Sequence, residues 1–125
     1  MGICSFRDLE VWQTGMELVK RVYGLTADFP KREVYGLSSQ LQRAAVSIPA
    51  NTAEGHARSS TKEFLQHISI AQGSLAELET LLILARDLAY CDSATLTKLL
   101  ALCGSEARML SGLRRRLKQK LQSSP

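Results

Sequence analysis

The sequence predicts an all-α protein, an antiparallel up-down-up-down four-helix bundle. Apolar residues recur at helical spacing in four segments, the links between these segments are short, and the third segment carries an unbroken heptad pattern. A chain of 125 residues has the length of one domain. We therefore expect a single domain with helices over about residues 7–28, 37–54, 61–90 and 93–121.

The first helix is indicated by apolar residues between Leu9 and Tyr23 that fall on or beside one stripe. Ser5 is expected as its N-cap. Pro30 ends it, because a proline restrains the preceding residue, Phe29, from helical backbone.

The second helix contains a proline, Pro49, inside its periodic run. Such a proline gives up a backbone hydrogen bond and costs roughly 3 kcal/mol. We expect Pro49 to bend the helix so that Asn51 to Gly55 reaches towards a neighbouring element. A tight turn that splits the segment into two helices is the alternative. Gly55 is expected to be a left-handed residue just past the helix end.

The third helix opens with a capping box, Ser60 followed by Glu63. Its heptad stripe predicts left-handed bundle packing. The stripe consists of Phe64, Ile68, Ala71, Leu75, Leu78, Leu82, Ala85 and Ala89.

The same helix has more apolar and small residues than one seam needs. Leu81, Leu84 and Leu88 lie on a second stripe. A third face is made of the small residues Ser69, Gly73, Ala76 and Thr80. A wide core face would explain this, and so would burial against another subunit.

A polar line follows the outer side of the second helix. Either this line is a solvated face, or it meets polar groups of a neighbouring helix or subunit. In the second case Glu79 is the expected partner of Arg43. The line consists of Arg43, Ser47, Asn51, Glu54 and Arg58.

The fourth helix starts after Asp92 and becomes basic after Glu106, the last acid in the chain. Cations near a helix C-terminus are favoured by the helix dipole, so they can serve helix ending and solubility alone. They also form a patch able to neutralise phosphates. The cations are Arg108, Arg114, Arg115, Arg116, Lys118 and Lys120.

Motifs of common enzyme classes are missing from the sequence: it has no phosphate-binding glycine loop and no G-x-S-x-G elbow. An iron or manganese site in a bundle core needs two Glu-x-x-His motifs on facing helices. Here Glu63 and His67 are four residues apart, and the sequence has no second pair. The three cysteines, Cys4, Cys91 and Cys103, show no C-x-x-C spacing. We expect no catalytic residues, no cofactor and no metal. Without an uninterrupted apolar run of about 18 residues or a signal peptide, we also expect no membrane span and a cytoplasmic location.

Three stretches together resemble a known family: FRDLEVWQ, DFPKREVYGLSSQLQRAAVSIPANTAEGHARSS and EFLQHISIAQGSLAELETLLILARDLAY. From Phe6 to about Tyr90 the chain resembles the proteins encoded by intervening sequences within bacterial 23S rRNA genes. A related member is the accessory variability protein of diversity-generating retroelements. Thr52 and Ala57 depart from the family pattern, which usually has isoleucine and often glycine there.

The resemblance implies an antiparallel four-helix bundle that assembles as a homopentamer and has no established catalytic activity. It also implies, for retroelement relatives, a basic surface that meets nucleic acid and a reverse transcriptase. We therefore expect a non-enzymatic oligomer that binds RNA or DNA, with structured RNA or an RNA–protein complex favoured. The alternative is a protein-binding assembly or adaptor module without nucleic-acid binding.

Overall fold

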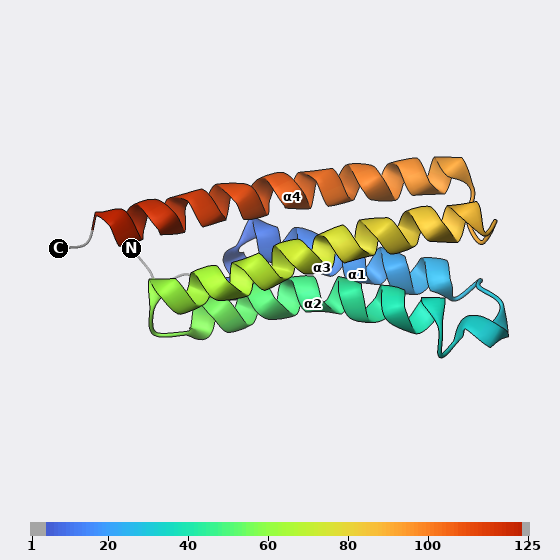
Figure 1. The fold of residues 1–125 in the computed structure, drawn as a ribbon, viewed down its shortest axis with the longest axis horizontal. Helices are drawn as coiled ribbons and strands as arrows, with labels where there is room; N and C mark the ends of the chain where they lie inside the picture. Colours follow the sequence, from blue (N-terminus) through green and yellow to red (C-terminus); the bar gives the residue numbers. More distant parts are fainter. Residues whose placement is uncertain (1–4, 124–125) are drawn as a thin grey trace.

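A computed structural model describes residues 5–123, so Cys4 lies outside the described residues. Four α-helices and two short 3₁₀ turns, η1 and η2, make up the described chain, which contains no strand. Figure 1 shows the four helices lying side by side along the long axis of the molecule. The expectation of an all-α fold is confirmed.

The first predicted helix is divided in two. Ser5 caps the short turn η1 (Phe6–Asp8) and forms a capping box with Asp8. Leu9 then has extended backbone, with φ −76° and ψ 125°, and α1 runs over Glu10–Thr26. The predicted start at residue 7 therefore falls in η1, because Ser5 caps that turn and not α1.

The second helix, α2, is one helix over Leu37–Ala57 with Pro49 inside it. The two-helix alternative is therefore wrong. Glu33, in η2 (Lys31–Glu33), caps α2: its carboxylate accepts a hydrogen bond from the backbone N–H of Leu37 at 3.0 Å. This bond is the main reason that the pKa of Glu33 is lowered.

Gly55 has a different role from the one expected. It lies inside α2, and no described glycine has a positive φ. A Cβ built on Gly55 would lie 2.7 Å from Cβ of His67 and 2.8 Å from Cδ1 of Phe64, both on the next helix. Gly55 therefore permits close contact between the two helices, and the chain leaves α2 only after Ala57.

The third helix, α3, spans Thr61–Asp87 and is capped by Ser60, which accepts a hydrogen bond from the backbone N–H of Glu63 at 3.1 Å. It stops three residues before the predicted end at Tyr90. Ala89 has a left-handed backbone, φ 64°, and the N–H of Tyr90 turns back to the carbonyl of Ala85 at 2.8 Å. Alanine rarely adopts this conformation, so the sequence carried no sign of it.

The fourth helix, α4, spans Ser93–Gln122. Asp92 is its N-cap and accepts a hydrogen bond from the backbone N–H of Thr95 at 2.7 Å. Around the molecule, α2 packs against α1 and α3, while α4 packs against α3 and α1. The core between them includes the predicted α3 stripe from Ile68 to Ala85, whereas Ala89 at its end is exposed.

One face of α3 remains exposed. Its small residues are exposed together with the larger apolar side chains of Ile70, Ile83, Leu84 and Leu88. We call this surface the α3 face; its small residues are Ser69, Gly73, Ala76 and Thr80. Among described residues, α3 alone is long and apolar enough by composition to cross a membrane, with a mean hydropathy of 1.4 over 18 residues. This is weak evidence, since the core helix of a bundle passes the same test.

Candidate nucleic-acid interface

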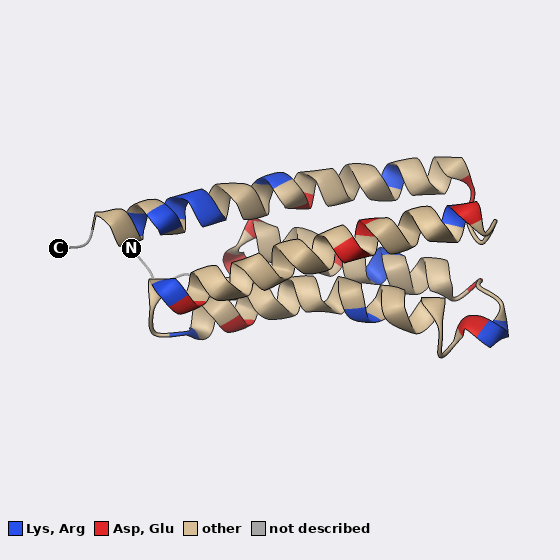
Figure 2. Cartoon of the chain, in the orientation of Figure 1, with Lys and Arg blue, Asp and Glu red and all other residues tan. Residues whose placement is uncertain are grey.

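The six predicted cations all lie on the last four turns of α4. Figure 2 shows them as the largest gathering of Lys and Arg on the described chain. The core side of the helix is occupied by buried residues such as Leu110, Leu113 and Leu117. Arg108 and Arg115, seven residues apart, are exposed on the opposite side.

Five of these cations, Arg108, Arg114, Arg115, Arg116 and Lys118, take part in none of the ion pairs of the described chain. The pairs are Arg21–Glu17, Arg58–Glu54 and Arg86–Asp87, all on other helices. Glu106, the only acid within this half of α4, is fully buried. Arg108, Arg115, Arg116 and Lys118 are therefore exposed cations on a helix half whose one acid is buried.

A groove of about 470 Å³ lies between α3 and the end of α4, and we call it the α3–α4 groove. Arg114 borders it and donates a hydrogen bond from Nη1 to Oε1 of Gln72 on α3, at 3.2 Å. The Nε atom of Arg114 is buried without a hydrogen-bond partner. The lining consists of Gln72, Ser111, Arg114, Arg115, Lys118, Gln119 and Gln122.

A second, smaller groove of about 240 Å³ separates α4 from the start of α1. Arg108 and Arg116 border it, together with one acid, Glu10, and apolar residues such as Leu9 and Met109. The cations therefore form two groups: Arg114, Arg115 and Lys118 face the α3–α4 groove, whose described lining contains no acid, whereas Arg116 lies on the α1 side. Sequence spacing alone had treated them as one patch.

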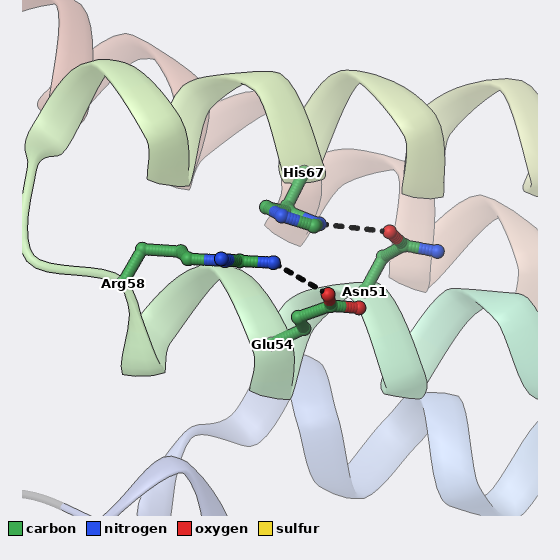
Figure 3. A network of polar contacts seen from close by, with 4 residues as sticks. All are labelled: Asn51, Glu54, Arg58 and His67. Atoms are coloured by element: carbon green, nitrogen blue, oxygen red, sulfur yellow. Dashed lines mark hydrogen bonds and ion pairs between the residues drawn. The ribbon is translucent and has the colours of Figure 1, made fainter.

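Two residues of the polar line on α2, Ser47 and Asn51, contact α3 within the same chain. Asn51 donates from Nδ2 to the carbonyl and hydroxyl oxygens of Ser47, at 2.9 and 3.0 Å. Its Oδ1 is left as the acceptor for Nδ1 of His67, at 3.0 Å, and Arg58 pairs with Glu54 at 2.8 Å (Figure 3). A further bond runs from Ser74 to Ser47, at 2.8 Å. The bonds of Asn51 and Ser47 therefore join α2 to α3, whereas the Arg58–Glu54 pair links exposed residues at the end of α2.

The expected pair between Arg43 and Glu79 is not formed in the described chain. Arg43 is exposed and borders a shallow pocket with Glu77. Glu79 lies towards α4, where its charge acts on Cys103. Glu77 and Glu79 are two residues apart, so they point to different sides of α3, and Glu79 lies away from Arg43.

The sequence interpretation missed both Gln72 and the burial of Glu106. Glu106 falls midway between Cys103 and Leu110 on the apolar face of α4, so the heptad spacing itself could have placed it in the core. Burial raises the pKa of Glu106 to about 8. Burial, followed by the charges of Glu79 and Glu106, raises the pKa of Cys103 to about 12.

Cys91 and Cys103 are both free thiols. Within residues 5–123, no three histidine, cysteine or acidic side chains are grouped so as to hold a metal ion.

Comparison with known proteins gives one family. Residues 7–112 match the family model of the 23S rRNA-intervening sequence protein. No curated protein matches the chain. The matched region includes all of α1, α2 and α3 and two thirds of α4, but it stops before the last cations of the basic half.

Proposed function

The chain belongs to the family of 23S rRNA-intervening sequence proteins, and from this premise we propose that it is a cytoplasmic, non-catalytic protein that binds nucleic acid through α4. The favoured ligand is structured RNA or an RNA–protein complex. Phosphates would be bound by the basic half of α4, from Arg108 to Lys120.

One observation carries this proposal: six cations follow Glu106 on one helix, and no acid follows it. Arg108, Arg114, Arg115, Arg116 and Lys118 take part in none of the ion pairs of the described chain. A helix rises about 1.5 Å per residue, so this region is about 18 Å long. That length is comparable to about five base-pair steps of a nucleic-acid strand.

We also propose that the four helices run antiparallel, up-down-up-down, and that copies of this bundle assemble as a homopentamer. The short connections after α2 and α3 support the helix directions, because they leave room only for chain reversal. The α3 face supports assembly: Ile70 is 51% exposed and Leu88 is 48% exposed beside small residues that permit close helix packing. Several basic helices in one particle would bind one RNA more tightly than a single helix.

A protein-binding assembly module is the second candidate, and the α3 face favours it. In that case the same apolar surface would bind another protein, and the cations of α4 would serve only solubility and helix ending. The two candidates differ in what controls ligand affinity. Affinity for nucleic acid depends on salt and on the charge of α4, whereas affinity of a protein for the α3 face does not require that charge.

Binding of a labelled RNA hairpin tests the proposal. The protein is compared with a triple variant in which Arg114, Arg115 and Arg116 are alanine. A control triple variant changes the exposed Lys20, Lys31 and Lys62 to alanine, which removes the same charge from other helices. We expect at least a tenfold loss of affinity in the first variant and little loss in the control. Equal losses would show that only net charge matters, and no binding at low salt would favour the protein-binding candidate.

A further inference from the structure

We infer that the α3–α4 groove holds one phosphate group of a nucleic-acid strand on a single edge of the Arg114 guanidinium, and that Gln72 fixes this guanidinium in place. The inference rests on the proposed function and assigns separate roles to cations that the function treats together. Arg114 is the anchor, Gln72 is a positioning residue, and Arg115 and Lys118 supply charge.

The hydrogen bonding of Arg114 singles it out among the cations of α4. Its Nη1 donates to Oε1 of Gln72 at 3.2 Å, which ties the guanidinium to the neighbouring helix. Arginine binds phosphate best through two parallel N–H groups. With Nη1 occupied by Gln72, the edge formed by Nε and Nη2 remains for a ligand.

The Nε atom of Arg114 is a buried donor without an acceptor. Such groups are uncommon in folded proteins, because an unpaired buried donor loses its hydrogen bond to water and gains nothing in return. A phosphate oxygen that enters the groove, with a small shift of the side chains at its edge, supplies the missing acceptor.

The lining of the groove defines the chemistry of the ligand. Arg115 and Lys118 add two positive charges, and among the described residues no carboxylate lines the groove. Ser111, Gln119 and Gln122 add neutral hydrogen-bonding groups, which suit sugar hydroxyls and base edges. The groove beside α1 differs, because Glu10 there would repel a phosphate. A phosphodiester strand therefore fits the α3–α4 groove better.

Two charge-conserving variants test the anchor. Arg114→Lys keeps the positive charge but removes the two-pronged edge, whereas Arg115→Lys makes the same change at an exposed position outside the bond to α3. With a labelled RNA hairpin we expect at least a fivefold loss of affinity for Arg114→Lys and less than a twofold loss for Arg115→Lys. Equal effects would overturn the role of Arg114 as anchor.

Two further variants test the positioning residue. Gln72→Glu places a carboxylate beside Arg114, where it would pair with the guanidinium and exclude phosphate. Gln66→Glu adds the same charge at an exposed position elsewhere on α3. We expect at least a tenfold loss of RNA affinity for Gln72→Glu and at most a twofold loss for Gln66→Glu, with unchanged circular dichroism in both.

The outcomes separate this inference from the proposed function. If the unchanged protein binds the hairpin and the two glutamate variants weaken binding equally, the groove assignment is wrong while the function of α4 stands. If the unchanged protein does not bind the hairpin at low salt, both are wrong. Selective loss in Gln72→Glu and Arg114→Lys, with melting temperatures unchanged, supports both.

Discussion

The carboxyl group of Glu106 on α4 packs against Gly15 on α1. A Cβ built on Gly15 would lie 3.1 Å from Oε2 of Glu106 and 3.3 Å from Cβ of Pro49, so three helices meet at this point. Glu106 is 0% exposed, and both of its carboxyl oxygens lack a hydrogen-bond partner. The core of the molecule therefore contains an acid whose charged form is poorly solvated.

The stability of the fold should fall as the pH rises, because of Glu106. Burial raises the pKa of this carboxyl from 4.5 to about 8, so the folded state holds the proton more tightly than the unfolded state. The resulting stabilisation is fully present below pH 4.5 and is lost as the pH rises towards 8. Between pH 5 and pH 8 the loss is roughly 3 kcal/mol in the free energy of unfolding.

Denaturant unfolding of the protein and of Glu106→Gln at these two pH values measures this loss. Glutamine does not ionise, so the variant should lack about this part of the pH dependence, while other titrating groups affect both proteins alike. The same pH dependence in both proteins would show that Glu106 does not carry it.

Gly15→Ala should destabilise the fold by about 1–3 kcal/mol, because its new Cβ would press on Glu106 and Pro49. Gly24→Ala is the matched control on the same helix, since a Cβ there meets nothing within 4 Å. The control should gain up to about 1 kcal/mol from better helix propensity. Thermal melts measure the stability of both variants. A Gly15→Ala protein that gains as much stability as Gly24→Ala would contradict this packing.

Gly55→Ala should destabilise the contact between α2 and α3 by about 1–3 kcal/mol, since its Cβ would lie under 3 Å from carbon atoms of both His67 and Phe64. Gly104→Ala meets only the flexible end of Arg108, at 3.6 Å, and serves as the comparison. Denaturant unfolding measures both. A Gly55→Ala protein that loses no more stability than Gly104→Ala would contradict this close contact between α2 and α3.

Gly73→Arg should dissociate the proposed oligomer while leaving the single chain folded. Gly73 is exposed on the α3 face, and a Cβ there meets nothing within the chain. A second copy packed on this face would collide with the arginine. Gly24→Arg makes the same change on α1, at another exposed glycine with open space around it. Light scattering after gel filtration should show a smaller mass for Gly73→Arg alone; unchanged mass in both would remove the α3 face from the assembly.

The periodicity of the sequence was sufficient to predict four helices, and Asp92 and Ser60 mark the starts of two of them through side-chain caps. The other helix ends were harder to predict, because they depend on backbone conformations that the residue type does not indicate. Ala89 adopts a left-handed conformation that glycine usually provides. Gly55, which looks like such a glycine, instead lies inside α2 and serves packing.

The candidate site was predictable in part. The basic run after Glu106 is visible in the sequence, and the helix places all of it on α4. The groove was not visible, because its wall includes Gln72, which is 42 residues before Arg114 and joins it only through the packing of α3 against α4. The selection of Glu79 as partner of Arg43 failed for a related reason: which side of α3 faces α2 depends on the rotation of the whole helix.

The salt dependence of RNA affinity tests the role of α4 most directly. The logarithm of the binding constant for a labelled hairpin should fall linearly with the logarithm of salt concentration, with a slope set by the number of phosphates neutralised. We predict a steep slope for the protein, a clearly shallower slope when Arg114, Arg115 and Arg116 are alanine, and an unchanged slope when Lys20, Lys31 and Lys62 are alanine. Binding that is absent at low salt, or a slope that is the same in all three proteins, would contradict nucleic-acid recognition by α4.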